Sequence, residues 1–124
     1  MRTRVLVADE HEGARKALKD ILQNDSRYEV CGEAIDGLEA AEKVRALKPD
    51  VAVIDTMDVI QAVREIRATS PSTKIIIVSI YDSAAIAQMA AMIGADAFLT
   101  KTQCGLYLNR TVAAVLRGGH AATG

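Results

Sequence analysis

The sequence has little that would tie it to a metal cluster, to nucleic acid or to a membrane. Its two cysteines, Cys31 and Cys104, lie far apart without a metal-binding spacing, so we expect two free thiols. The formal net charge of −1 gives no bulk electrostatic basis for binding nucleic acid. The first apolar run stops at Asp9, too early for a signal peptide, and the apolar stretch at 84–93 is about half as long as a bilayer requires. We therefore expect a cytoplasmic protein that neither enters a membrane nor, by itself, binds nucleic acid.

What the sequence does contain is a series of apolar segments that are continuous rather than alternating. They predict five strands, at residues 4–8, 28–34, 51–55, 74–80 and 95–99. A strand that reads as an unbroken apolar run is buried on both faces, which is typical of a parallel sheet. With 124 residues, half of them hydrophobic, the chain is long enough for one domain with a proper core.

Helical spacing of apolar residues fills the intervals between these strands. Helices are expected at 12–24, at 83–93, at 104–117 and after two capping boxes, Asp36–Glu39 and Asp58–Gln61. The positions expected to face the core are Ala14, Ala17, Leu18, Ile21 and Leu22, then Leu38, Ala41, Val44 and Leu47, then Val59, Val63 and Ile66, and finally Leu108, Val112 and Val115. Strict alternation of strands and helices predicts right-handed crossovers and an α/β doubly wound parallel sheet with helices on both faces.

The helix at 83–93 is rich in alanine and methionine and has few polar positions. Met89 and Met92 are expected to fill the core. The surplus alanines are open to two interpretations, either harmless helix formers on the surface or a patch for a partner or a homodimer.

Polar, chemically useful residues stand where the predicted strands end. Asp9 and Glu10 follow the first strand, Asp55 closes the third, Ser79 lies at the end of the fourth, and Lys101 follows the last. The carboxyl ends of parallel strands share one edge of the sheet, so these side chains should meet there. Crowded carboxylates repel one another, and Mg²⁺ suits an all-oxygen site that relieves this repulsion. A carboxylate beside Mg²⁺ can attack a phosphoryl group, while an ammonium and a hydroxyl neutralise the transferred oxygens.

Each of these residues also has a simpler interpretation. The acidic pair could cap the first helix, Asp55 could be another cap, Ser79 could be an ordinary hydroxyl at a strand end, and Lys101 could be a solvated charge. The combination favours a site, because all four strand ends supply complementary chemistry. His11 follows the acidic pair and is expected only at the rim of that site.

Several segments together resemble the receiver domain of two-component response regulators. They are Val5–Glu10, Val53–Asp55, Ile77–Ser79 and Phe98–Lys101. Val30–Ala40, Ser79–Asp82 and Arg117–His120 are similar to the NarL/FixJ branch of that family. The resemblance implies a flavodoxin-like (CheY-like) fold of five parallel strands in the order 2-1-3-4-5 with five helices. It also implies a domain at residues 1–119, with 120–124 as a tail or the start of a linker to an absent helix-turn-helix output domain.

The same resemblance implies a role for each site residue. Asp55 is expected to be the phosphoacceptor, supplied by a sensor histidine kinase. Mg²⁺ would be held by the carboxylates of Asp9, Glu10 and Asp55 and by the backbone carbonyl of Met57. Ser79 corresponds to the switch hydroxyl, Lys101 to the phosphate-binding lysine and Phe98 to the switch aromatic. The same resemblance implies transcriptional output through the absent domain. It also implies no enzymatic activity beyond self-phosphorylation and slow dephosphorylation.

The loop after Asp55 departs from the family pattern. Thr56-Met57-Asp58 leads straight into a helix, about four residues sooner than the family's usual M-P-x-x-D-G segment allows. This shortening could displace the Met57 carbonyl, so the alternative is a pseudo-receiver that binds proteins without being phosphorylated. A phosphatase of the haloacid-dehalogenase type is disfavoured, because it usually has a second aspartate where Met57 stands.

Overall fold

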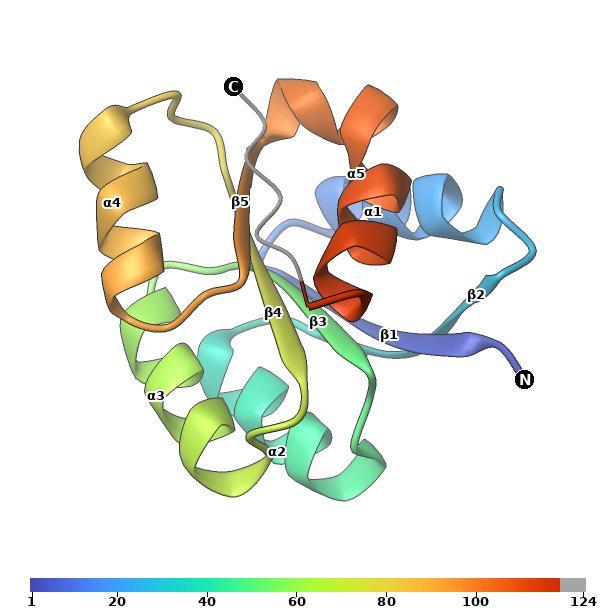
Figure 1. Cartoon of the computed structure of the whole chain (residues 1–124), viewed down its shortest axis with the longest axis horizontal. Helices are drawn as coiled ribbons and strands as arrows, with labels where there is room; N and C mark the ends of the chain where they lie inside the picture. The colour runs from blue at the N-terminus through green and yellow to red at the C-terminus, as the bar shows by residue number, and fades with distance from the viewer. Residues whose placement is uncertain (119–124) are drawn as a thin grey trace.

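The computed structural model describes residues 1–118 and places ten elements in strict alternation. In chain order they are β1 (Thr3–Asp9), α1 (Glu12–Gln23), β2 (Tyr28–Ala34), α2 (Gly37–Leu47), β3 (Val51–Asp55), α3 (Val59–Thr69), β4 (Lys74–Ser79), α4 (Ala84–Met92), β5 (Ala97–Thr100) and α5 (Lys101–Leu116) (Figure 1). The predicted tail at 120–124 lies outside the described residues, as does Gly119. No helix within residues 1–118 has both the length and the apolarity needed to cross a bilayer.

The five strands form one parallel sheet in the order β2-β1-β3-β4-β5, which confirms the predicted fold class. The pairing of β1 with β2 shifts by one residue between Val5 and Leu6, and Leu6 then faces Gly32. A Cβ on Gly32 would lie 2.9 Å from Leu47 Cδ1 and 3.1 Å from Leu6 Cδ1. A larger residue at position 32 would therefore require the Leu47 side chain to shift, which agrees with glycine at this point of the strand.

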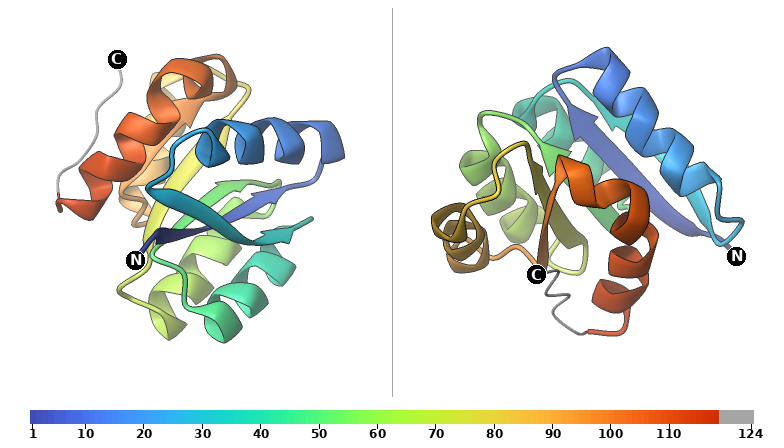
Figure 2. Two further views of the ribbon diagram at one scale, coloured as in Figure 1. Left: turned by 90° about the vertical axis from the view of Figure 1, so that its right-hand side faces the viewer. Right: turned by 90° about the horizontal axis from the view of Figure 1, so that it is seen from above.

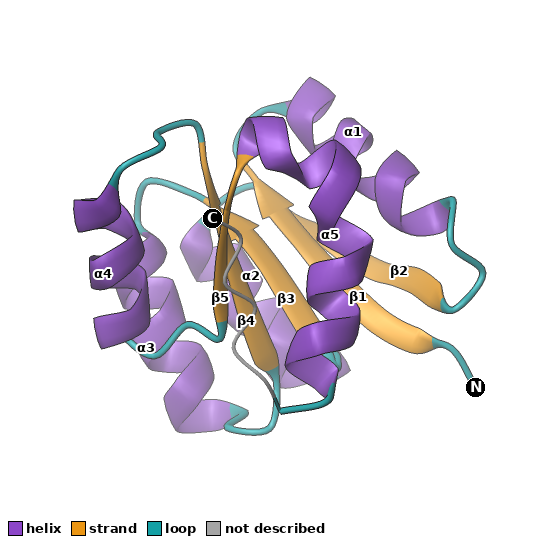
Figure 3. Cartoon of the chain, turned by 45° about the horizontal axis from the view of Figure 1, so that its top comes forward, coloured by secondary structure: helices purple, strands orange, loops and turns teal. Residues whose placement is uncertain are grey.

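Two apolar layers cover the sheet, and alternate residues of each strand enter one or the other. Val5 and Val7 pack with α1 and α5, whereas Leu6 and Ala8 pack with the helices of the opposite face. Figure 2 and Figure 3 show α1 and α5 on one side of the sheet and α2 and α3 on the other. This double covering explains why the strands read as continuous apolar runs.

Three residues expected in the core lie at the surface. The buried face of α2 runs through Gly37, Ala40, Ala41 and Val44. Leu38 lies about 100° around the helix from Gly37, outside this face, and is 61% exposed. The prediction that Leu38 faces the core was therefore wrong. Ala17 of α1 is also exposed. Met92 is 85% exposed, because it stands about 200° around α4 from Ala90, the buried residue of that helix.

The helix starts agree with the sequence only in part. Asp36 caps α2 by accepting the N–H of Glu39 at 2.8 Å, as predicted, while Glu39 reaches back to the N–H of Ile35. The second capping box is absent: Asp58 has ψ of 34° rather than an extended backbone, and its side chain accepts no hydrogen bond from α3. The last helix begins at Lys101 instead of residue 104, after Thr100, whose N–H donates to Gln103.

Candidate functional site

Asp9 and Asp55 face each other at the carboxyl edge of the sheet. They are the final paired residues of β1 and β3, which lie side by side. Asp9 is fully buried, whereas the side chain of Asp55 is 25% exposed. The parallel register therefore brings two carboxylates from distant parts of the chain together, one inside the protein and one at its surface.

Lys101 joins these two carboxylates. Its Nζ lies 2.5 Å from Asp9 Oδ2 and 3.0 Å from Asp55 Oδ2. Burial disfavours the ammonium, but hydrogen bonds to Asp9 and Asp55 outweigh it and raise the pKa of Lys101. Burial raises the pKa of Asp55, Lys101 opposes this effect, and the charges of Asp9 and Glu10 add to it. The early start of α5 places this lysine at the site, because Lys101 is the first residue of the helix.

Glu10 connects the site to the short loop after Asp55. Its Oε1 accepts the N–H of Met57 at 2.8 Å, while the Met57 side chain is 92% exposed. This backbone hydrogen bond holds the shortened loop against the acidic pair. The Met57 carbonyl as a metal ligand stays a prediction.

A cavity of about 350 Å³ opens over these groups. Its lining includes Glu10, His11, Asp55, Ser79 and Lys101. Ser79 closes β4, and its Oγ accepts the N–H of Tyr81 at 3.1 Å. The sheet thus brings the predicted hydroxyl, carboxylates and ammonium to one opening, with His11 at its rim as expected.

Phe98 lies apart from the groups that line this opening. It is half-buried on β5, faces Ile77 of β4, and packs against the apolar layer under α2, α3 and α4. Its part in switching stays a prediction.

The donor set has the composition that Mg²⁺ prefers, but four of its six carboxylate oxygens contact N–H or ammonium groups of the protein. No three His, Cys, Asp or Glu side chains within residues 1–118 are arranged to hold a metal ion. Asp9 Oδ2 is engaged by Lys101, and Glu10 Oε1 by the Met57 N–H. Three carboxylates against one ammonium leave excess negative charge, which favours a divalent cation. The residues fit Mg²⁺ in chemistry, provided that Lys101 and Met57 release these oxygens.

Sequence patterns gave no sign of several contacts at the site. The backbone N–H of His11 donates to Asp9 Oδ1 at 2.8 Å, and Arg15 Nη1 donates to the Asp9 carbonyl at 2.9 Å. Thr56, next to Asp55, is 6% exposed, and its Oγ1 has no hydrogen-bond partner within residues 1–118. Helical spacing alone puts Arg15 on a polar face, so only the fold reveals where its guanidinium points.

Comparison with known proteins defines the class to which this fold and site belong. The sequence model of the response regulator receiver domain matches residues 5–108. The chain therefore belongs to the response regulator receiver domain family, as the resemblance predicted.

Individual relatives support the same assignment. The chain is 40% identical to chemotaxis protein CheY of Thermotoga maritima, over 82% of this chain and 87% of that protein. It is 39% identical to a protein-glutamate methylesterase/protein-glutamine glutaminase of Pyrococcus abyssi, over 86% of this chain. The aligned part makes up only 30% of that enzyme.

Solved structures include relatives from more than one branch. A LuxR-family two-component response regulator from Aurantimonas sp. SI85-9A1 superposes with a TM-score of 0.91 at 28% identity, covering 98% of this chain and 90% of that one. The receiver domain of the putative response regulator NarL from Mycobacterium tuberculosis gives a TM-score of 0.79 at 30% identity, covering 90% and 97%. The response regulator domain of Thermotoga maritima CheB gives 0.76 at 32% identity, covering both chains completely.

Proposed function

We propose that this receiver domain is a phosphorylation switch whose phosphoacceptor is Asp55. The observation that carries the proposal is the contact of one ammonium, that of Lys101, with both Asp55 and the buried Asp9 beneath an open cavity. The Asp55 carboxylate is accessible enough to meet a donor, and its partners can compensate charge on a transferred group.

The placement of these groups supports the following phosphoryl transfer. An Asp55 oxygen attacks the phosphorus of a phosphohistidine on a sensor histidine kinase. A P–O bond forms, the P–N bond breaks, and the histidine ring keeps the electron pair of that bond and takes up a proton. Bound Mg²⁺, held by Asp9, Glu10, Asp55 and the Met57 carbonyl, would neutralise oxygens of the phosphoryl group. Lys101 would exchange its contact with Asp55 for one with the new phosphate.

Conformational switching would begin at Ser79. Its Oγ accepts the Tyr81 N–H, and a hydroxyl that accepts one hydrogen bond can still donate another, so donation to a phosphate oxygen would draw the end of β4 toward Asp55. Phe98 neighbours β4 and would repack, changing the surface formed by α4, β5 and α5. That surface, with Met92 exposed on α4, is where we place a homodimer contact.

The output of the switch is a separate proposal. The LuxR-family relatives favour a DNA-binding output domain, so that regulation of transcription would occur through a segment outside this chain. The CheY and methylesterase relatives favour chemotaxis instead. We favour transcriptional output, because segments resembling the NarL/FixJ branch occur in three separate parts of the chain.

The second candidate function is that of a pseudo-receiver that binds proteins without being phosphorylated. The hydrogen bond between Glu10 and the Met57 N–H favours it, since this contact ties up a carboxylate that Mg²⁺ would need. An NMR titration with Mg²⁺ separates the two functions. Changes in the chemical shifts of Asp9, Asp55 and Met57 would support phosphorylation, and unchanged chemical shifts at all three would support the pseudo-receiver.

The direct test is incubation with acetyl phosphate and Mg²⁺, followed by the intact mass of the protein. We expect the wild type to gain one phosphoryl group, and Asp55→Asn to gain none. Omission of Mg²⁺ should also abolish the gain. No gain in the wild type, or an equal gain in Asp55→Asn, would overturn the proposal.

A further inference from the structure

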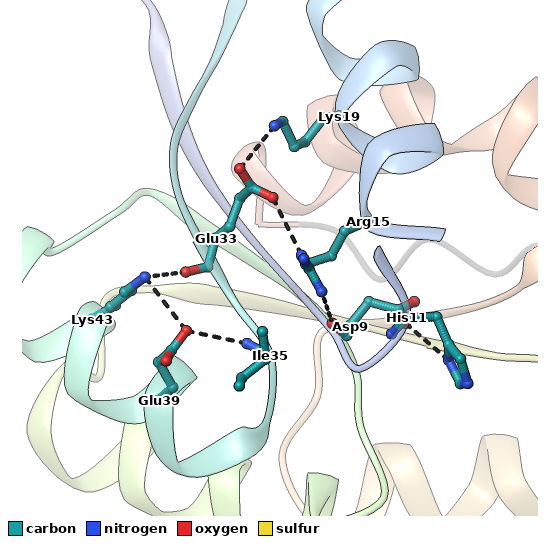
Figure 4. A network of polar contacts seen from close by, with 8 residues as sticks. All are labelled: Asp9, His11, Arg15, Lys19, Glu33, Ile35, Glu39 and Lys43. Atoms are coloured by element: carbon teal, nitrogen blue, oxygen red, sulfur yellow. Dashed lines mark hydrogen bonds and ion pairs between the residues drawn. The ribbon is translucent and has the colours of Figure 1, made fainter. Parts of the chain in front are cut away.

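Arg15 links the phosphorylation site to the edge of the sheet. It lies near the start of α1, and its side chain is only 15% exposed. Nη1 donates to the backbone carbonyl of Asp9 at 2.9 Å, and Nε donates to Glu33 Oε1 at 3.3 Å (Figure 4). One rigid guanidinium therefore joins the end of β1 to a carboxylate on β2.

Glu33 is held in place from two helices. Its Oε2 accepts a hydrogen bond from Lys19 of α1 at 2.8 Å, and its backbone carbonyl accepts one from Lys43 of α2 (Figure 4). The hydrogen bond from Lys19, opposed by burial and aided by Arg15, lowers the pKa of Glu33. Glu33 therefore stays ionised at neutral pH and is a fixed anchor for the guanidinium of Arg15.

This anchor acts where β2 no longer pairs with β1, although Asp9 still pairs with Asp55 of β3 on its other side. The pairing of β1 with β2 ends at Ala8 and Ala34, one residue before Asp9. Beyond that point Arg15 supplies a donor to the Asp9 carbonyl, while Lys101 and the His11 N–H bind the Asp9 carboxylate. The backbone and the side chain of Asp9 are thus fixed by separate partners.

We propose that Arg15, braced by Glu33, is a positioning residue that sets the affinity of the site for a divalent cation. The inference rests on the proposed function, in which that cation is Mg²⁺. The brace holds the turn that carries Asp9, Glu10 and His11, so the cation does not have to order this turn when it binds. Loss of such an outer partner typically weakens metal binding by about 10- to 100-fold.

The experiment combines two measurements on the folded domain. An NMR titration with Mg²⁺ alone gives the Kd, and hydrogen exchange of the His11 amide without Mg²⁺ reports the order of the turn. We expect Arg15→Gln to weaken Mg²⁺ binding about tenfold and to speed exchange at His11. Glu33→Gln should have a smaller effect in the same direction. The double variant should bind no more weakly than Arg15→Gln, because both changes remove one connection.

Lys16→Gln is the matched control. Lys16 is a cation of the same helix that pairs with Asp20 at 3.0 Å on the exposed face, away from the site. It should leave both the Kd and the exchange rate unchanged. A merely structural role of Arg15 would lower the urea midpoint of Arg15→Gln while its Kd for Mg²⁺ stayed at the wild-type value, and that result would overturn the inference.

Three further outcomes are distinguishable. If Arg15→Gln does not fold, the Glu33→Gln variant provides the test. An exchange rate of the His11 amide in Glu33→Gln equal to that in Lys16→Gln would overturn the proposal that Glu33 braces Arg15. If the wild type does not bind Mg²⁺, the proposed function and the affinity role of Arg15 both fail. If the wild type binds Mg²⁺ and Arg15→Gln binds it equally well, only the inference about Arg15 fails.

Discussion

Asp58 Oδ1 accepts the backbone N–H of Gly37 at 2.9 Å and thereby joins the starts of α3 and α2. Gly37 is the first residue of α2, so its N–H has no partner within its own helix. The short loop after Asp55 thus ends in a carboxylate that caps the neighbouring helix instead of α3. This contact fixes the far end of the loop, whereas Glu10 holds Met57 at its centre.

Gly37→Ala should destabilise the domain. A Cβ at this position would lie 2.5 Å from Asp58 Oδ1 and 2.7 Å from its Cγ, so the side chain and the loop must shift. We expect a loss of about 1–3 kcal/mol in the free energy of unfolding, measured with urea.

Two controls accompany this variant. Gly13→Ala, at a position with nothing within 4 Å of a new Cβ, should stabilise α1 by about 0.5–1 kcal/mol. Adding Asp58→Ala to Gly37→Ala removes the clash, so the double variant should be less destabilised than the sum of the single changes. Simple additivity would show that Asp58 does not limit the space at Gly37.

Thr56→Val should be neutral or stabilising by up to about 1 kcal/mol. The Thr56 hydroxyl is buried without a partner within the described residues, so its removal relieves a desolvation cost. Thr73→Val is the matched comparison, since Thr73 Oγ1 bonds to the Pro49 carbonyl at 2.9 Å and to Ser70 Oγ at 2.8 Å. It should cost about 1–3 kcal/mol by urea unfolding. Equal effects would contradict this account of Thr56.

Asp55→Asn should change the pH dependence of stability. Burial raises the pKa of Asp55 despite Lys101, so the folded domain binds this proton more tightly than the unfolded chain does. The resulting stabilisation is present below the ordinary pKa and is lost as pH rises through the folded pKa. The variant should therefore lose less stability than the wild type as pH rises from the ordinary pKa of an aspartate, about 4, through the raised pKa of Asp55 in the folded domain. Urea midpoints at each pH measure this, and parallel profiles would contradict it.

Lys101→Met should leave the buried Asp9 carboxylate without its ammonium. We expect a loss of about 2 kcal/mol, below the range for a fully buried pair because the Lys101 side chain is 23% exposed. Mg²⁺ should stabilise this variant more than the wild type, since the cation replaces the missing charge. Urea unfolding with and without Mg²⁺ provides the measurement. A smaller stabilisation of the variant would argue against competition between Lys101 and the cation for Asp9.

The sequence was most informative where one local pattern determines the structure. Burial on both faces makes each strand an apolar run, so runs such as Val5–Ala8 and Ile75–Val78 located the sheet, and the order of the chain placed Asp9 and Asp55 at one edge. Patterns were less informative on helices, where Leu38 and Met92 have apolar side chains but lie outside the narrow faces that touch the sheet.

Long-range polar contacts could not be predicted from local patterns. Asp58–Gln61 matches a capping box in sequence, yet the backbone of Asp58 is not extended in the short loop. Its side chain accepts the N–H of Gly37 instead of one from α3. Arg15 and Glu33 are 18 residues apart and meet only because β2 lies beside β1. Such contacts depend on the packed arrangement of elements, which spacing along the chain does not encode.

The most direct test of the central claim locates the phosphoryl group. The domain is treated with acetyl phosphate and Mg²⁺, reduced with borohydride, which converts an aspartyl phosphate to homoserine, and digested for peptide mass spectrometry. We expect conversion at Asp55 alone, dependent on Mg²⁺ and absent without the phosphodonor. Conversion at another carboxylate such as Asp9, or none at Asp55, would contradict it.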